Sequence, residues 1–137
     1  MSPASRSLQD QQSGNHQSGS AVAEFALAAG LLLIVALGVF QVALYGHVRS
    51  LASNAAAEGA RYAALLDRTA DDGAAFTRER LAASLNSSFA RDVTAQVLDH
   101  DGLKLVEVKA KVPLPLIGYL GPAGVIEVTG HALIAAP

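Results

Sequence analysis

The residues of this chain that could take part in chemistry are a few charged side chains, and Glu24 is the most unusual of them. It lies near the start of a long apolar stretch in which no polar side chain occurs from Phe25 to Phe40. A carboxylate at the centre of a membrane span costs about 2.5–3.5 kcal/mol, and less near the interface. Two interpretations are open: Glu24 reaches the headgroups at the positive end of a helix dipole, or it pairs with a cation from another subunit.

The other charged residues predict no catalytic or metal site. Glu58 and Arg61 are three residues apart, a helical spacing that predicts a surface ion pair of about 0.3 kcal/mol. Asp99 and Asp101 occupy the first two acidic positions of a calcium loop, but the third position and the distal Glu are missing, so a turn is favoured. The histidines are too dispersed for a shared metal site: His16, His47, His100 and His131. We therefore expect no enzyme, no catalytic residue, no metal and no cofactor.

The segment that carries Glu24 is long enough to cross a membrane. A helix rises about 1.5 Å per residue, so Ala21 to Tyr45 would extend roughly 37 Å against a hydrocarbon core of about 30 Å. We predict a transmembrane helix over residues 20–46 and its continuation as a stalk over residues 47–67. The stalk has a stripe of small residues that could pack on another subunit or on the protein's own head: Ala52, Ala55, Ala56, Gly59 and Ala63.

Residues 1–19 precede the span and are polar, with too few apolar side chains to fold, so we interpret them as a leader. The charges around the span do not predict its orientation. Arg6 is offset by Asp10 on one side, while Arg49 and Arg61 lie on the other.

Residues 68–137 predict a small α+β head. After a break at residues 67–73, with Asp72 as a possible N-cap, residues 74–90 have a helical apolar stripe of Leu81, Ala82, Leu85 and Phe89. The period then changes to two, which predicts a hairpin with one wet face and a third strand. The alternating positions are Val93, Ala95 and Val97; Val106, Val108, Ala110 and Val112; and Ile126, Val128, Ala132 and Ile134. The predicted fold class is α+β: a long N-terminal transmembrane and stalk helix, a second short helix and a three-stranded antiparallel sheet.

Two surfaces of this head have alternative interpretations. Arg78, Arg80 and Arg91 are more typical of a solvated face than of a basic patch, because Glu79 and Asp92 lie beside them. The apolar residues 114–120 would either contact a partner or cover the open edge of the sheet.

Composition favours a small membrane-anchored protein. The chain has 137 residues, of which 51% are hydrophobic and 16% charged, so it allows one anchor and one small domain at most. The net charge of −2 gives no electrostatic argument for nucleic acid. There is no Cys, so a head outside the cytoplasm would be stabilised by packing alone.

Two motifs resemble a known family. Gly19 is followed by four small or apolar residues, Glu24-Phe25 and a hydrophobic run. This pattern resembles the processing site of prepilins of the tight-adherence (Flp) system, where a membrane aspartyl peptidase cuts after the Gly. Residues 54–63, which include Glu58-Gly59-Ala60-Arg61, resemble the second signature of TadE-like pseudopilins.

The resemblance implies a minor pilin or pseudopilin that is cleaved between Gly19 and Ser20 and uses Glu24 and Phe25 for assembly and register. It also implies the inner membrane, a prepilin peptidase, other pilin subunits and the pilus assembly platform as partners. The N-terminus would be cytoplasmic and the head extracytoplasmic, with the processed protein associated with the pilus and active in adhesion and secretion. The alternatives are a single-span protein with an exported binding domain, and a secreted protein released by signal peptidase.

Overall fold

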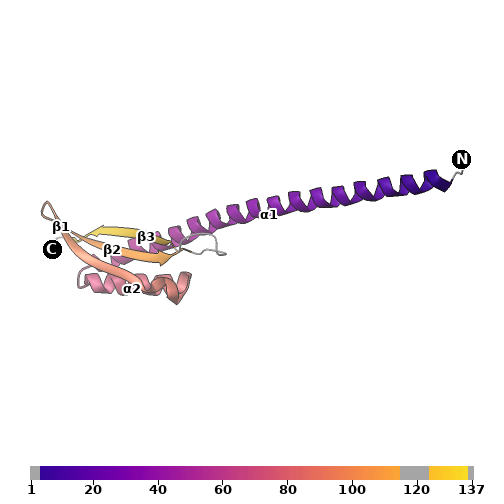
Figure 1. Ribbon diagram of the computed structural model, residues 1–137. Helices are drawn as coiled ribbons and strands as arrows, with labels where there is room; N and C mark the ends of the chain where they lie inside the picture. Colours follow the sequence, from indigo (N-terminus) through magenta and orange to yellow (C-terminus); the bar gives the residue numbers. More distant parts are fainter. Residues whose placement is uncertain (1–3, 115–123, 136–137) are drawn as a thin grey trace. The chain divides into compact units, whose positions relative to one another are not determined.

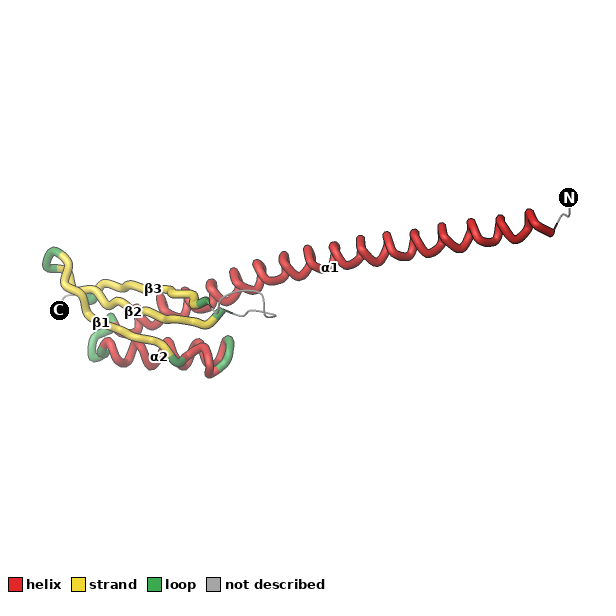
Figure 2. Tube along the Cα trace, in the orientation of Figure 1, coloured by secondary structure: helices red, strands yellow, loops and turns green. Residues whose placement is uncertain are grey.

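The computed structural model describes residues 4–114 and 124–135, with side chains described from residue 18 onward. The helices are α1 (Ala4–Ala63), α2 (Ala70–Ser84) and the 3-10 helix η1 (Ser87–Ala90). The strands are β1 (Asp92–His100), β2 (Leu103–Pro113) and β3 (Val125–Leu133), as Figures 1 and 2 show. The chain divides into two compact units, Met1–Phe40 and Gln41–Pro137, and each is described by itself. The second unit is called the head below.

The first unit is α-helical through all of its described residues. We predicted that the polar residues before Gly19 would not fold, but α1 begins at Ala4. Nucleation is the costly step of helix formation, whereas each added residue needs only one further backbone bond. The adjoining apolar segment therefore supports a helix that the polar residues would not form alone.

The head contains the predicted three-stranded antiparallel sheet, in the order β1-β2-β3. The first hairpin turns at Asp101 and Gly102, whose φ angles are +54° and +81°. Positive φ at both central residues is typical of a type I′ turn, which matches the twist of the flanking strands. The Gly102 N–H also donates a hydrogen bond of 3.2 Å to Asp99 Oδ1. The Asp99–Gly102 motif is therefore a turn, as predicted.

The core of the head lies between one face of the sheet and the two helices α1 and α2 (Figure 1). Its members alternate along β2 and recur at helical spacing along α1. They are Val48, Ala52, Ala55, Ala56, Ala60, Ala63, Ala74, Leu81, Val93, Val106, Val108, Ala110, Val112, Ile126 and Val128. The backbone of α1 comes so close to β3 that a Cβ on Gly130 would overlap the carbonyl group of Ala56. The small residues of α1 thus pack on the protein's own head.

Both helix boundaries around the connecting loop differ from the prediction. The apolar period continues to Leu66, but α1 ends at Ala63 and the chain turns at residues 64–67, where Asp67 adopts a φ of +67°. Helix α2 begins at Ala70, because Thr69 rather than Asp72 is the N-cap.

The second helix also ends earlier than predicted, at Ser84 instead of residue 90. The chain then forms η1, with Asn86 as its N-cap. Leu81 is buried, whereas Ala82 is exposed and Leu85 and Phe89 are half-buried against the core. The stripe that α2 buries consists of Gly73, Ala74, Thr77 and Leu81.

Candidate functional site

The predicted cleavage position lies within α1. Gly19 and Ser20 are both helical and exposed, and a Cβ on Gly19 would contact no described residue beyond its own stretch of helix within 4 Å. Neither residue has a packing role in the helix, so this position can be substituted without disturbing the described structure.

Glu24 lies one helical turn after Ser20 and accepts a hydrogen bond of 3.2 Å from the Ser20 hydroxyl. Residues four apart lie on the same face of a helix, which is why the two side chains meet. Among the residues that the structure describes, Glu24 has no ion pair. The carboxylate is therefore held beside the predicted cleavage position, and no described residue neutralises it.

The helix that follows presents apolar side chains on its whole surface. Phe25 and Leu27 are each 75% exposed, and Leu32 is 70% exposed. The segment Ser18–Ala63 contains a window that is long and apolar enough to cross a membrane. An apolar helix exposed all round is typical of a membrane span.

The second motif, Glu58-Gly59-Ala60-Arg61, lies in the head and has a packing role. Ala60 is completely buried. A Cβ on Gly59 would overlap the Thr77 hydroxyl and lie 2.8 Å from the carbonyl oxygen of Gly73. Only glycine allows α1 and α2 to approach so closely. Gly59 is thus required by the tight packing of α1 against α2.

The charged members of this motif do not form the predicted pair. Glu58 makes an ion pair of 3.1 Å with Arg80 of α2, and Arg61 is exposed without an ion pair among the described residues. The prediction considered α1 alone, whereas α2 places a better-positioned cation beside Glu58. The other two arginines form no patch with Arg80: Arg78 donates a 2.7 Å hydrogen bond to the Val93 carbonyl, and Arg91 is exposed.

Aromatic and guanidinium groups gather next to this motif, which sequence reasoning missed. The rings of Tyr62 and Phe76 stack with centroids 4.7 Å apart. Arg68 lies 4.7 Å from the centroid of Tyr62, and Arg80 lies 5.4 Å from that of Phe76. Each arginine is close enough for a cation–π interaction. The spacing of four residues between Glu58 and Tyr62 indicates that both lie on one face of α1. The residues that α2 contributes depend on how the two helices pack, which the sequence does not specify.

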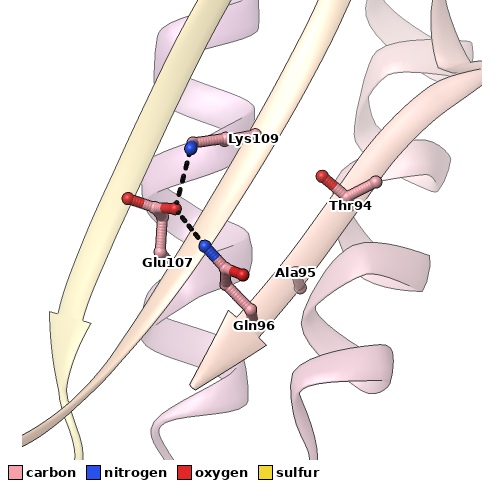
Figure 3. Close-up of a pocket in the computed structure, with 5 residues that line it drawn as sticks. All are labelled: Thr94, Ala95, Gln96, Glu107 and Lys109. Carbon is pink, nitrogen blue, oxygen red and sulfur yellow. Dashed lines mark hydrogen bonds and ion pairs between the residues drawn. The ribbon is translucent and has the colours of Figure 1, made fainter. Parts of the chain in front are cut away.

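A second cluster that the sequence did not predict lies on the outer face of the sheet, around Glu107. Gln96, Glu107 and His131 are directly opposite one another on the three strands. Gln96 Nε2 donates to Glu107 Oε1 at 2.7 Å, Lys109 Nζ lies 3.1 Å from the same oxygen, and His131 Nε2 lies 2.9 Å from Oε2. Figure 3 shows the first two of these interactions.

These contacts change the state of the Glu107 carboxylate. We predicted that Glu107 would lie on a wet face, but it is only 8% exposed because its neighbours cover it. The Gln96 hydrogen bond, followed by those of His131 and Lys109, lowers the pKa of Glu107 from 4.5 to about 2. A pocket of about 220 Å³ beside it is lined by Thr94, Ala95, Gln96, Glu107 and Lys109 (Figure 3). Its polar groups already bond to one another, so we assign it no ligand.

The predicted partner loop at residues 114–120 lies outside the described residues, apart from its first residue. The Leu114 N–H donates to the Gly124 carbonyl at 2.9 Å. Both interpretations of this loop therefore stay predictions.

The fold and these motifs define a class of protein: one apolar helix of membrane-spanning length joined to a small α+β head. The model of the family described as TadE-like protein matches residues 19–61, from the predicted cleavage glycine to the last residue of the second motif. This match confirms the resemblance to TadE-like proteins over that segment. No curated protein and no solved structure matches the chain.

Proposed function

We propose that this chain is a minor pilin or pseudopilin of a tight-adherence (Flp-type) pilus and that a prepilin peptidase cleaves it between Gly19 and Ser20. The observation that carries the proposal is the family match over residues 19–61, which joins the glycine, the Glu24-Phe25 pair, the apolar helix and the second motif in one segment. A single-span protein with an exported head would need the apolar helix, but it would need neither motif.

Cleavage would create a charge beside Glu24. Hydrolysis of the peptide bond leaves a new α-amine on Ser20, which is cationic at neutral pH. An isolated carboxylate and an isolated ammonium are both unfavourable in hydrocarbon, but together they partly cancel. We propose that Glu24 of a neighbouring subunit neutralises this amine in the filament core and thereby sets the axial register.

In the uncleaved helix, Glu24 contacts Ser20 of its own chain. Because Glu24 already accepts a hydrogen bond from the Ser20 side chain, its carboxylate lies next to the residue that becomes the N-terminus. Phe25 is directly adjacent and exposed, so it can contact the neighbouring helix. The role we propose for these residues is structural, and the chain needs no catalytic residue of its own.

The proposed setting follows from this pathway. The precursor would be anchored in the inner membrane with its N-terminus in the cytoplasm and its head outside. It would meet the prepilin peptidase, then other pilin or pseudopilin subunits and the assembly platform, with a role in adhesion and secretion through the assembled pilus.

The test is the intact mass and N-terminal sequence of the membrane-fraction protein, expressed with and without the matching prepilin peptidase. We expect the chain to start at Ser20 only when the peptidase is present. The matched control is Gly19→Val: nothing packs against Gly19, so the variant should fold and insert but stay uncleaved. A start at or near Met1 in both samples would contradict the proposal and leave a simple single-span protein.

A further inference from the structure

The head carries an open groove on the side of its helices that faces away from the sheet. Glu58, Arg61, Tyr62, Leu65, Phe76 and Arg80 line it, and its volume is about 320 Å³. On α1, a rotation of 100° per residue places Glu58 and Arg61 opposite the buried stripe around Ala56. Leu65 is 57% exposed at one end. We call these six residues the helix groove.

The charge of the helix groove is positive around an apolar floor. Arg61, Arg80 and the nearby Arg68 contribute three cations. Among the described residues, Arg80 forms an ion pair with Glu58, Arg68 acts on the carboxylate of Asp72, and Arg61 has no ion pair. The floor consists of the stacked rings of Tyr62 and Phe76 together with Leu65. Such a surface fits an apolar segment that has carboxylates at its edge.

The opposite layer of the head carries a surface of that composition. Leu98, Leu105 and Leu133 are directly opposite one another on the three strands, on the face of the sheet that does not contact the helices. Leu133 is 64% exposed, and Leu103 at the end of the hairpin is 61% exposed. We call the four residues Leu98, Leu103, Leu105 and Leu133 the leucine patch.

Acidic residues lie at the rim of the leucine patch. Asp99 and Asp101 belong to the hairpin turn next to Leu98 and Leu103, and both are exposed. The Asp101 side chain is 95% exposed and lies 3.9 Å from His100 Nε2, and the exposed Lys104 is opposite Asp99. Leu103 and Leu133 are exposed, whereas Leu98 and Leu105 are half-buried between them. Neighbouring apolar side chains on one sheet face are typical of a contact surface.

We propose that the leucine patch of one copy of this chain docks into the helix groove of a second copy. The leucines would pack on Leu65 and on the ring edges of Tyr62 and Phe76, because the ring faces contact each other, Arg68 and Arg80. The carboxylate of Asp101 would approach Arg61, which has no ion pair among the described residues. Burial of apolar surface would stabilise the contact. The charges would fix the orientation and disfavour a contact between two grooves, because their arginines would repel each other.

The positions of the two surfaces define the symmetry of the contact. They lie on opposite layers of the head, so the contact is heterologous, and each copy keeps one free patch and one free groove. Copies related in this way can all point in the same direction, as heads joined to spans in one membrane must. The array is open-ended and can grow by one copy at a time.

The test uses disulfide formation between copies, because the chain has no cysteine of its own. The double variant Leu65→Cys/Leu133→Cys places one thiol in the groove and one in the patch, both at exposed positions. Full-length protein in membranes, made in cells without prepilin peptidase, is treated with a mild oxidant and separated without reductant. The absence of the peptidase makes the result independent of cleavage.

We expect the double variant to form a ladder of dimers, trimers and larger species. Each single variant alone should give little product, because a heterologous contact never brings two copies of one residue together. Adding Arg61→Gln or Asp101→Asn should lower the yield severalfold; Asn keeps the positive φ of position 101 without strain. The matched control is Ser88→Cys/Leu133→Cys, with an exposed thiol outside the groove, which should give no ladder.

Several results would overturn the proposal. Efficient dimers from either single variant would show a symmetric contact instead. A second pair, Arg61→Cys/Leu103→Cys, tests the same contact. If neither double variant forms a ladder, the proposed contact between copies is excluded. A product of this chain with a different protein, and none between copies, would assign the groove to another partner.

Discussion

Gly59 of α1 and Gly73 of α2 lie against each other, and the carbonyl oxygen of each glycine faces the position that a Cβ on the other would occupy. A Cβ on Gly59 would lie 2.8 Å from the oxygen of Gly73, and a Cβ on Gly73 would lie 2.6 Å from that of Gly59. The Thr77 hydroxyl lies at the same contact: it donates a 2.8 Å hydrogen bond to the Gly73 carbonyl of its own helix and lies 3.4 Å from the Ala55 carbonyl oxygen of α1. The two helices therefore touch through their backbones at this point.

Gly59→Ala should destabilise the head by about 1–3 kcal/mol, because the new methyl group overlaps Thr77 and the backbone of α2 cannot move away without disturbing the core. The measurement is hydrogen exchange of the buried β2 amides, Val106 to Val112, in detergent-solubilised protein. Gly46→Ala is the matched control on the same helix, since nothing lies within 4 Å of its Cβ position. The control should be neutral or more stable by up to about 1 kcal/mol. Equal behaviour of the two variants would disprove the close contact.

Glu107→Gln should change how the stability of the head depends on pH. The pKa of Glu107 is lowered from 4.5 to about 2, so the folded state prefers the carboxylate in its ionised form. This contribution to the free energy of unfolding is complete above about pH 4.5 and disappears as the pH falls toward 2. The wild type should lose stability steeply in this window, and the variant should show a shallower loss.

The pH experiment is read from denaturant unfolding of full-length protein in micelles between pH 2 and 7. Glu127→Gln is the control, because Glu127 is an exposed carboxylate on the neighbouring strand with no ion pair among the described residues. It should keep the wild-type slope. If the free energy of unfolding of Glu107→Gln follows the same pH dependence as that of the wild type, the three partners of Glu107 do not lower its pKa.

Thr69→Ala should destabilise α2 by about 1 kcal/mol, because it removes the N-cap. The Thr69 hydroxyl accepts from the Asp72 N–H at 3.2 Å, and Asp72 Oδ2 accepts from the Thr69 N–H at 2.8 Å. The Thr69 backbone bond, helped by the Thr69 side chain, lowers the pKa of Asp72, so the cap should also weaken in acid. Thermal unfolding by circular dichroism measures the effect, with Ser50→Ala on the exposed face of α1 as the control. Identical melting of both variants would rule out a stabilising capping box.

Glu24→Ala should leave cleavage intact but abolish incorporation into pili, because the new amine of Ser20 would have no partner. Glu24→Gln should have the same effect, although its amide oxygen can still accept from the Ser20 hydroxyl. The two variants separate the charge from the hydrogen bond. Immunoblots of sheared pili and of membranes give the measurement, with Val22→Ala as a control on the same helix. Normal incorporation of either Glu24 variant would exclude the charge pair.

The sequence predicted the fold well where one periodicity dominated. The alternation along β1, β2 and β3 corresponds to strands at nearly the predicted residues, because a sheet with one buried face requires this pattern. The long apolar run predicted the helix because of its length, which is enough to cross a membrane. The start of α1 was wrong by sixteen residues, because the polar segment continues the apolar helix. The end of α1 and both limits of α2 were wrong by four to six residues, since they depend on local features such as the cap at Thr69.

The parts of the site that were missed depend on contacts between distant segments. Glu107 looked like a solvated residue of an alternating strand, but the register brings Gln96 and His131 beside it. Glu58 was paired with a residue on its own helix, whereas Arg80 comes from α2. A pattern within one element predicts which face is apolar, but it does not specify which polar groups meet across elements.

The glycine contact also limits how this protein can be recombined with others. The family match ends at Arg61, whereas Gly73 and Thr77, against which Gly59 packs, lie beyond it. A chimera that joins a foreign head to this helix must therefore have small residues opposite Gly59. Larger residues there would prevent the second helix from packing against α1. Whether a head fits this helix thus depends on two positions of α2 in the head, Gly73 and Thr77.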